Sequence, residues 1–276
     1  MTFAFSEEQQ ELRRGLRRFL EDKSPSRQVR RLMETDDGYD RAVWSQMAEQ
    51  LGLQGLTIAD EHGGAGGGPV EQLIVLEEMG RVLLCAPYFA TAVLAVNALQ
   101  ASSDAAAQRE MLPRIAAGTT IATLAVPEDD GSWSTDRLQT RARRSGDAFV
   151  LDGRKSFVFD GAIADLVLVV ARAEEGPSLF AVDGRDPRIS RRALHTIDMT
   201  RKQAALTFDG VPARLVGTAG GAGSIVEKTL QLASVALAAE QVGGAQRCLD
   251  MVVSLATPDR SKTSGTFRSP RAAAAA

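Results

Sequence analysis

Histidine and cysteine are scarce in this chain. Among its 276 residues there are two histidines, His62 and His195, and two cysteines, Cys85 and Cys248. Neither histidine has a carboxylate or a cysteine at ligand spacing, so we expect no metal site and no histidine base. Two cysteines so far apart give no disulfide framework, which favours a reducing, cytoplasmic setting.

Strong net charge and long apolar runs are also missing. The formal net charge is −3, which gives no electrostatic reason to bind nucleic acid or an anionic membrane. No apolar run reaches the length of a membrane span, and the N-terminus lacks the basic and apolar parts of a secretion signal. Neither a Gly-Lys-Ser/Thr after the glycines of 63–68 nor a Gly-x-Ser-x-Gly elbow is present, so a phosphate loop and a hydrolase triad are unsupported. We expect a soluble protein of about two domains.

The N-terminal part, residues 1–119, has the pattern of a helical domain. Ser6 and Gln9 form a capping box at a first helix. Asp40 begins a second helix that Gly52 stops, and Pro69 begins a third. The small apolar residues of 86–99 predict a buried helix, and Asp104 caps a last one.

Residues 120–223 have the pattern of a β-domain. Apolar runs alternate with turn clusters and predict strands at 121–126, 138–143, 149–151, 155–159, 166–171, 178–182 and 204–208. Asp152-Gly153 lies between two of these runs and predicts a hairpin. The expected fold class is α+β, with an antiparallel β-domain between helical units.

A helical pattern returns in residues 224–257, as the first helix of a further domain. Its apolar stripe follows helical spacing: Val226, Leu230, Ala233, Leu237, Gly244, Cys248 and Leu255. At about 100° per residue, Glu240 lies about 60° from the centre of this stripe, at the edge of burial. Pro258 breaks the helix, and residues 258–276 have no apolar face, so we expect a disordered tail.

Several local motifs, in this order, resemble the acyl-CoA dehydrogenase family. Residues 112–118 (LPRIAAG) resemble the family's LPxIAxG, and Glu128 with Gly131-Ser132 resembles its flavin loop, TEPxxGSD. Residues 153–158 (GRKSFV) resemble the NGxKxWI strand, and 160–165 the turn after it. The likeness covers about residues 1–257 and then stops, so the chain is identified as a C-terminally truncated member.

The motifs also depart from the family pattern. Pro127 replaces the usual Thr, the loop is one residue shorter between Glu128 and Gly131, Trp133 replaces Asp, and Phe159 replaces a Thr that commonly bonds the flavin. These changes resemble an actinobacterial branch with mixed-subunit dehydrogenases that act on steroid side-chain thioesters. Half of the subunits in such assemblies can lack a working flavin site.

The resemblance implies an FAD-dependent dehydrogenase in which a carboxylate removes the α-proton of an acyl-CoA thioester and the β-hydride passes to flavin N5. Some branches place the base near Ala233, which cannot serve; Glu240 is then either the base or a structural partner. The implied partners are a homologous subunit and an electron-transfer flavoprotein or similar acceptor. A non-catalytic partner subunit and an inactive truncated remnant are the alternatives. The family pattern places the cofactor-binding residues at Leu124, Val126, Gly131, Ser132, Phe157 and Phe159.

Overall fold

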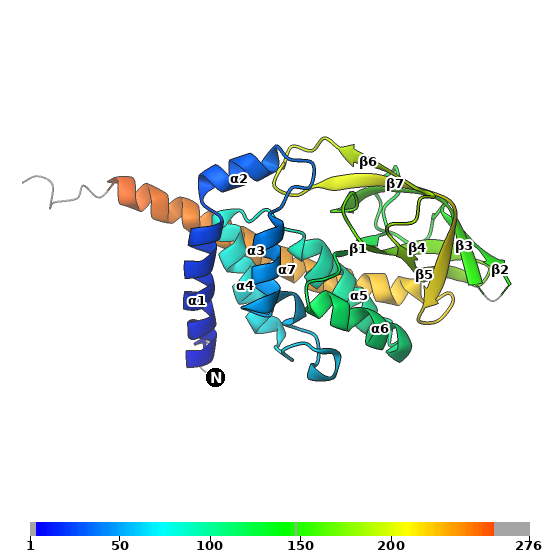
Figure 1. Cartoon of the computed structure of the whole chain (residues 1–276), viewed down its shortest axis with the longest axis horizontal. Coiled ribbons are helices and arrows are strands. Elements are labelled where there is room, and N and C mark those ends of the chain that lie inside the picture. The colour runs from blue at the N-terminus through cyan, green and yellow to red at the C-terminus, as the bar shows by residue number, and fades with distance from the viewer. Residues whose placement is uncertain (1–3, 147, 257–276) are drawn as a thin grey trace, which may run out of the picture.

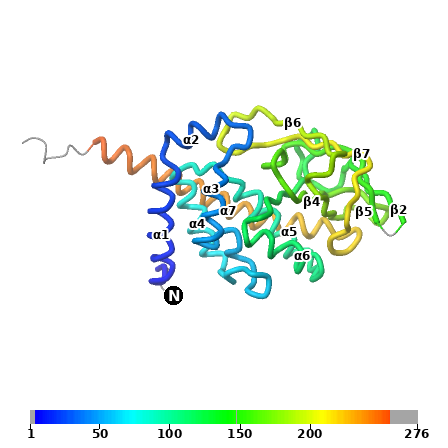
Figure 2. Tube along the Cα trace, in the orientation of Figure 1, coloured from blue at the N-terminus to red at the C-terminus, as the bar shows by residue number. Residues whose placement is uncertain are grey.

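The computed structural model describes residues 4–146 and 148–256. Helices form one end of the molecule, a β-sheet forms the other, and one long helix runs along both (Figure 1). The trace in Figure 2 shows the same long helix passing behind the shorter ones and continuing beyond α1.

The helical end is built from six α-helices and three short helical turns. Their bounds are α1 Glu7–Lys23, α2 Ser26–Met33, α3 Arg41–Glu49, η1 Leu53–Gly55, η2 Asp60–His62, α4 Pro69–Val82, η3 Phe89–Ala95, α5 Val96–Ala101 and α6 Ala105–Ala116.

The predicted caps of these helices are confirmed. The Ser6 hydroxyl accepts the Gln9 amide at 3.2 Å, and the Gln9 side chain accepts the Ser6 amide at 3.0 Å. Asp40 and Asp104 cap α3 and α6 in the same way. The sequence analysis missed α2, whose helix begins after Pro25 without a side-chain cap. The expected buried helix at 86–99 is a π-helical turn, η3, that continues into α5.

The sheet has seven strands: β1 Ala122–Ala125, β2 Arg141–Ser145, β3 Ala148–Phe159, β4 Leu166–Ala173, β5 Gly176–Asp183, β6 Ile189–Leu194 and β7 Gln203–Val216. Their order is β1-β4-β2-β3-β7-β5, with β6 on β7, and β5 also pairs with β4. The β4–β5 pairing closes a ring of five strands, β4-β2-β3-β7-β5. The expected antiparallel pairing holds except where β1, and β2 at Arg141, pair with β4 in parallel.

The predicted hairpin at Asp152-Gly153 is wrong, because β3 runs unbroken through both residues. The pairing of β3 with β7 shifts register between Leu151 and Gly153, so the pair marks a β-bulge. Gly153 has φ +138°, and a Cβ there would lie 2.6 Å from the Thr140 Cα atom. Glycine is therefore needed at this position of the strand, because the backbone of Thr140 lies too close to leave room for a side chain. Strand β6 had no predicted counterpart.

The long helix α7, Ala222–Ala256, packs mainly against α4. The predicted stripe is only partly correct: Val226 and Ala233 are buried, but Leu237, Cys248 and Leu255 are exposed. The side that is buried runs through Ala222, Thr229, Ala236 and Gly243. A Cβ at Gly243 would lie 1.8 Å from the Glu77 carbonyl oxygen, and one at Gly80 would lie 2.0 Å from that of Glu240. Glycine on both helices therefore permits a very close contact.

Candidate functional site

Strand β1 leads into a loop whose position is set by Glu128. Leu124 and Val126, predicted to contact the cofactor, are buried in and just after β1. The Glu128 carboxylate accepts the backbone amides of Gln139 at 2.8 Å and Thr140 at 2.9 Å. Burial acts to raise the pKa of Glu128, but these amides and the nearby Lys155 outweigh it and keep the pKa below its usual value.

Lys155 lies fully buried beneath the same loop. Its Nζ donates to the Val126 carbonyl at 2.9 Å and to Glu128 Oε1 at 3.0 Å. Burial lowers the pKa of Lys155 to about 8, against the opposing effect of the Glu128 carboxylate. The ion pair thus joins β3 to the start of the loop inside the protein.

The predicted loop residue Gly131 lies against the predicted strand residue Phe157, and Ser132 follows it on the same loop. Gly131 has φ +72°, and a Cβ added there would lie 3.6 Å from the Phe157 ring. Phe157 itself has φ +58° and is 42% exposed. A non-glycine residue in the left-handed region is uncommon and marks local strain. Ser156 supports this arrangement, because its hydroxyl donates to the Asp129 carboxylate at 2.5 Å.

Phe159 and Glu240 are brought together by Arg201. The Arg201 guanidinium lies 4.5 Å from the ring centroid of Phe89 and 5.9 Å from that of Phe159. Its Nη2 donates to both Glu240 oxygens, at 2.5 and 2.6 Å. The sequence analysis did not single out Arg201 as a site residue, because no local pattern links it to a residue 39 positions further on. Arg201 therefore contacts β3, η3 and α7 at the same point.

Asp160, the first residue of the turn after β3, was also missed as a site residue. It is 8% exposed, has φ +50°, and its carboxyl has no hydrogen bond within the described residues. Burial raises the pKa of Asp160 to about 7, although the nearby positive charge of Arg201 opposes this. One guanidinium therefore lies near two carboxyl groups but bonds only that of Glu240.

These residues suit the flat ring of a flavin better than its phosphates. Phe157 offers an exposed aromatic surface beside Gly131, where no side chain intervenes. A pocket of about 320 Å³ adjoins the loop, and it is lined by Glu128, Asp130, Ser132, Ser134, Asp136, Arg137 and Leu138. Three carboxylates against one arginine disfavour a pyrophosphate. A phosphate group at this loop would need cationic groups from outside these lining residues.

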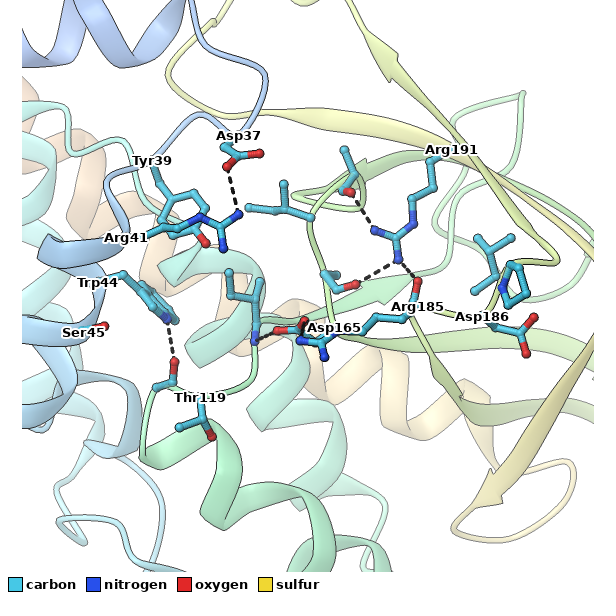
Figure 3. Close-up of a pocket in the computed structure, with 18 residues that line it drawn as sticks. Asp37, Tyr39, Arg41, Trp44, Ser45, Thr119, Asp165, Arg185, Asp186 and Arg191 are labelled. Atoms are coloured by element: carbon cyan, nitrogen blue, oxygen red, sulfur yellow. Dashed lines mark hydrogen bonds and ion pairs between the residues drawn. The ribbon is translucent and has the colours of Figure 1, made fainter.

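A larger cleft lies elsewhere, between α3 and the sheet (Figure 3). It has a volume of about 780 Å³. Its arginines are already engaged: Arg41 pairs with Asp37 at 3.0 Å, Arg185 with Asp165 at 2.6 Å, and Arg191 donates to the carbonyls of 162, 164 and 184. None of the predicted site residues lines this cleft.

Two family models match the chain in the order of its domains. The acyl-CoA dehydrogenase N-terminal domain matches residues 6–119, and the acyl-CoA dehydrogenase middle domain matches residues 123–211. The chain belongs to the acyl-CoA dehydrogenase family. The family assignment and the helical–β–helical fold predicted from the sequence are thereby confirmed.

Curated relatives include acyl-CoA dehydrogenase IpdE2 of Mycolicibacterium smegmatis, 29% identical over 90% of this chain and 64% of its own length. IpdE2 of Mycobacterium tuberculosis is 30% identical over 91% of this chain and 64% of its own length. The chain thus spans less than two thirds of these relatives.

Solved structures of the family superpose over most of the chain. One is the Tcur3481-Tcur3483 steroid ACAD G363A variant, with 31% identity, a TM-score of 0.79, and coverage of 90% of this chain and 66% of that one. Another is the ChsE4-ChsE5 complex from Mycobacterium tuberculosis, with 25% identity, a TM-score of 0.82, and coverage of 98% and 71%.

The described residues contain neither a group of side chains that could hold a metal ion nor a helix that could cross a membrane. No three His, Cys, Asp or Glu side chains within 4–146 and 148–256 are grouped so as to hold a metal ion. Over the same ranges, no helix has both the length and the apolar character needed to cross a bilayer.

Proposed function

We propose that this chain takes part in the FAD-dependent dehydrogenation of an acyl-CoA thioester to its 2,3-enoyl product. The observation that supports the proposal is the close approach of Gly131, on a loop held by the Glu128–Lys155 pair, to Phe157 of β3. The chain also matches the N-terminal and middle family domains. The flavin supplies the hydride acceptor, which no side chain can provide. Leu124, Val126 and Phe159 are included in the proposed cofactor site from the family pattern, although Leu124 and Val126 are buried.

Glu240 is the proposed base for the α-proton. It lies on α7 with its side chain 23% exposed, and both oxygens accept from Arg201. Both carboxylate oxygens are thus occupied by the guanidinium and are not free to meet a substrate proton. The proposal therefore requires Arg201 to move away from Glu240 when substrate binds. The structural alternative requires no movement.

The partners are proposed from the relatives. Two solved relatives carry the names of two proteins each, and one of them is called a steroid enzyme. A further similar structure is an electron transferring flavoprotein of Acidaminococcus fermentans, 25% identical with a TM-score of 0.82. We propose a homologous dehydrogenase subunit as partner, an electron-transfer flavoprotein or similar acceptor, and an acyl-CoA of the steroid side-chain class.

Co-expression with a homologous acyl-CoA dehydrogenase subunit tests the main proposal. The purified complex should show a flavin spectrum that an acyl-CoA bleaches under anaerobic conditions. A colourless complex that binds no thioester would reject the proposal. A soluble complex with a cooperative melting transition would in turn dismiss the alternative of an inactive remnant.

Glu240→Gln tests the proposed base in that complex. The change keeps the shape of the side chain and removes the proton acceptor, so turnover should fall about 100-fold or more with flavin retained. Glu227→Gln, on an exposed turn of the same helix, is the control. Normal turnover with a lower melting temperature would instead make Glu240 a structural partner of Arg201.

A non-catalytic partner subunit is the second candidate function. The carboxylates of Glu128, Asp130 and Asp136 around the loop pocket favour it, since they oppose a pyrophosphate. Phe159 also favours this candidate. Its ring lies near the Arg201 guanidinium, and it offers no hydroxyl that could bond a flavin. The flavin content of the co-purified complex separates the two functions: one flavin per chain rules this candidate out, and one per pair of chains supports it.

A further inference from the structure

Arg201 is held by two aromatic rings that leave its hydrogen-bond donors available. Its guanidinium carbon lies 4.5 Å from the ring centroid of Phe89 and 5.9 Å from that of Phe159. Such contacts attract the positive charge to the ring and use no N–H group. Of the three guanidinium nitrogens, only Nη2 donates within residues 4–146 and 148–256, and its acceptor is Glu240. The guanidinium can therefore exchange one carboxylate for another while it stays beside both rings.

Asp160 is fixed beside Arg201 by its main chain. Its amide donates to the Lys202 carbonyl at 2.9 Å, and its carbonyl accepts from two amides of the following turn, both at 3.1 Å. It directly follows Phe159, whose ring lies beside Arg201. The side chain, in contrast, has no hydrogen bond in the described part of the chain, although the residue is only 8% exposed. A buried carboxylate without a partner is costly, so the ionised form of Asp160 needs a cation.

The other basic groups around this turn have partners of their own. The Lys202 ammonium donates to the Met33 carbonyl at 2.6 Å. The Arg191 guanidinium donates to two carbonyls of the turn and to one of the β5–β6 connection. Arg201 is therefore the cation left for Asp160 among the described residues, and its positive charge acts on that carboxyl.

Two further titratable side chains face Asp160 from the helical end. Tyr39 precedes α3 and Cys85 follows α4, and the charge of Asp160 acts on both. Burial raises the pKa of Tyr39, and it raises that of Cys85 to about 11. Both groups are thus neutral near pH 7, and neither can replace Arg201 as the partner of a carboxylate.

We propose that Asp160 is a positioning residue: when its carboxyl loses its proton to solvent, it draws Arg201 away from Glu240 and so frees the Glu240 carboxylate. One guanidinium then serves two carboxyl groups in turn, because protonated Asp160 does not attract the cation and ionised Asp160 competes for it. Burial raises the pKa of Asp160 to about 7, against the opposing charge of Arg201, so the exchange falls near neutral pH. The consequence that freed Glu240 meets a substrate proton rests on the proposed function, whereas the exchange itself does not.

A double-mutant cycle tests the exchange without flavin or substrate. Urea denaturation of the full chain gives the coupling between Arg201→Met and Glu240→Gln as a ratio of unfolding constants. This coupling should be about 10-fold at about pH 5.5 and about threefold or less at about pH 8.5, because ionised Asp160 competes for the guanidinium. In an Asp160→Asn background the coupling should stay about 10-fold at both pH values. Asp198→Asn, which removes an exposed carboxylate three residues before Arg201, is the control and should behave as the wild type does.

NMR of the Arg201 side chain tests the same exchange where a variant of the cycle fails to fold. The Nε resonance, assigned with Arg201→Lys, should shift with a midpoint near pH 7 in the wild type and should not shift in Asp160→Asn. A coupling or a resonance that is constant with pH in the wild type, or that changes equally in Asp160→Asn, would overturn the proposal. A confirmed exchange together with normal turnover in Glu240→Gln would instead reject Glu240 as the base and leave the exchange established.

Discussion

Strand β3 and the turn that follows it carry two buried ionisable residues whose surroundings differ sharply. Lys155 is fully buried, and its ammonium donates to a carboxylate and a carbonyl. Asp160, five residues later, is almost as buried, but its carboxyl makes no hydrogen bond and only lies near Arg201, which is bonded to Glu240. A buried charge with partners fixes the elements it joins, whereas one without partners costs stability and becomes sensitive to pH.

Breaking the buried Lys155–Glu128 ion pair should lower the free energy of unfolding more than the other changes below. Lys155→Met leaves Glu128 mostly buried without its cation, with only two backbone amides as partners. Removing one member of a buried pair costs about 3–5 kcal/mol, and urea denaturation measures this loss.

The exposed pair of Arg143 and Asp152 provides the control for Lys155→Met. Their side chains are 65% and 37% exposed, so Arg143→Met should change the free energy of unfolding by about 1 kcal/mol or less. Equal losses of unfolding free energy in the two variants would mean that burial makes the Lys155–Glu128 pair no more important to stability than an exposed pair.

Replacing the buried Asp160 carboxyl by a neutral group should have the opposite effect and stabilise the protein at high pH. Because the pKa of Asp160 is raised to about 7 in the folded chain, the folded state holds the proton more tightly than the unfolded state does. Wild-type stability therefore falls as pH rises from about 4, the ordinary aspartate value, through about 7, and the loss is complete above that. Asp160→Asn removes the loss, and asparagine tolerates the left-handed φ of this position.

The expected gain for Asp160→Asn is about 2 kcal/mol at pH 8, since one pKa unit corresponds to about 1.4 kcal/mol and relaxation of the site absorbs part of it. The gain should vanish near pH 4. Two nearby groups do not titrate in this window, because burial raises the pKa of Cys85 to about 11 and also raises that of Tyr39. A constant difference between the variants at pH 5 and pH 8 would show that Asp160 titrates normally.

Features that depend on residues close together in the sequence could be predicted, whereas those that depend on distant residues could not. The caps at Ser6, Asp40 and Asp104 were predictable because a cap depends on residues two or three positions apart. Gly153 was misinterpreted, since a glycine that serves a turn and one that allows close contact with Thr140 look alike in sequence. Arg201 could not be placed, because its partners, Phe89 and Glu240, belong to two other elements.

The smallest expected effect concerns what holds Glu240 beside Arg201. Neighbouring glycines of α7 differ in their surroundings: a Cβ at Gly243 would lie 1.8 Å from the Glu77 carbonyl oxygen, but one at Gly244 has nothing nearer than 3.6 Å. Gly243→Ala should therefore push α7 from α4 and cost about 1–2 kcal/mol. Gly244→Ala should stabilise by up to about 1 kcal/mol, because alanine is the better helix former and meets only ordinary contacts. Opposite signs at adjacent positions in thermal unfolding would show that the close contact with α4 holds α7, and with it Glu240, in place. Equal stabilisation by both alanines would mean that α7 is free to shift, and that Arg201 alone fixes the position of Glu240.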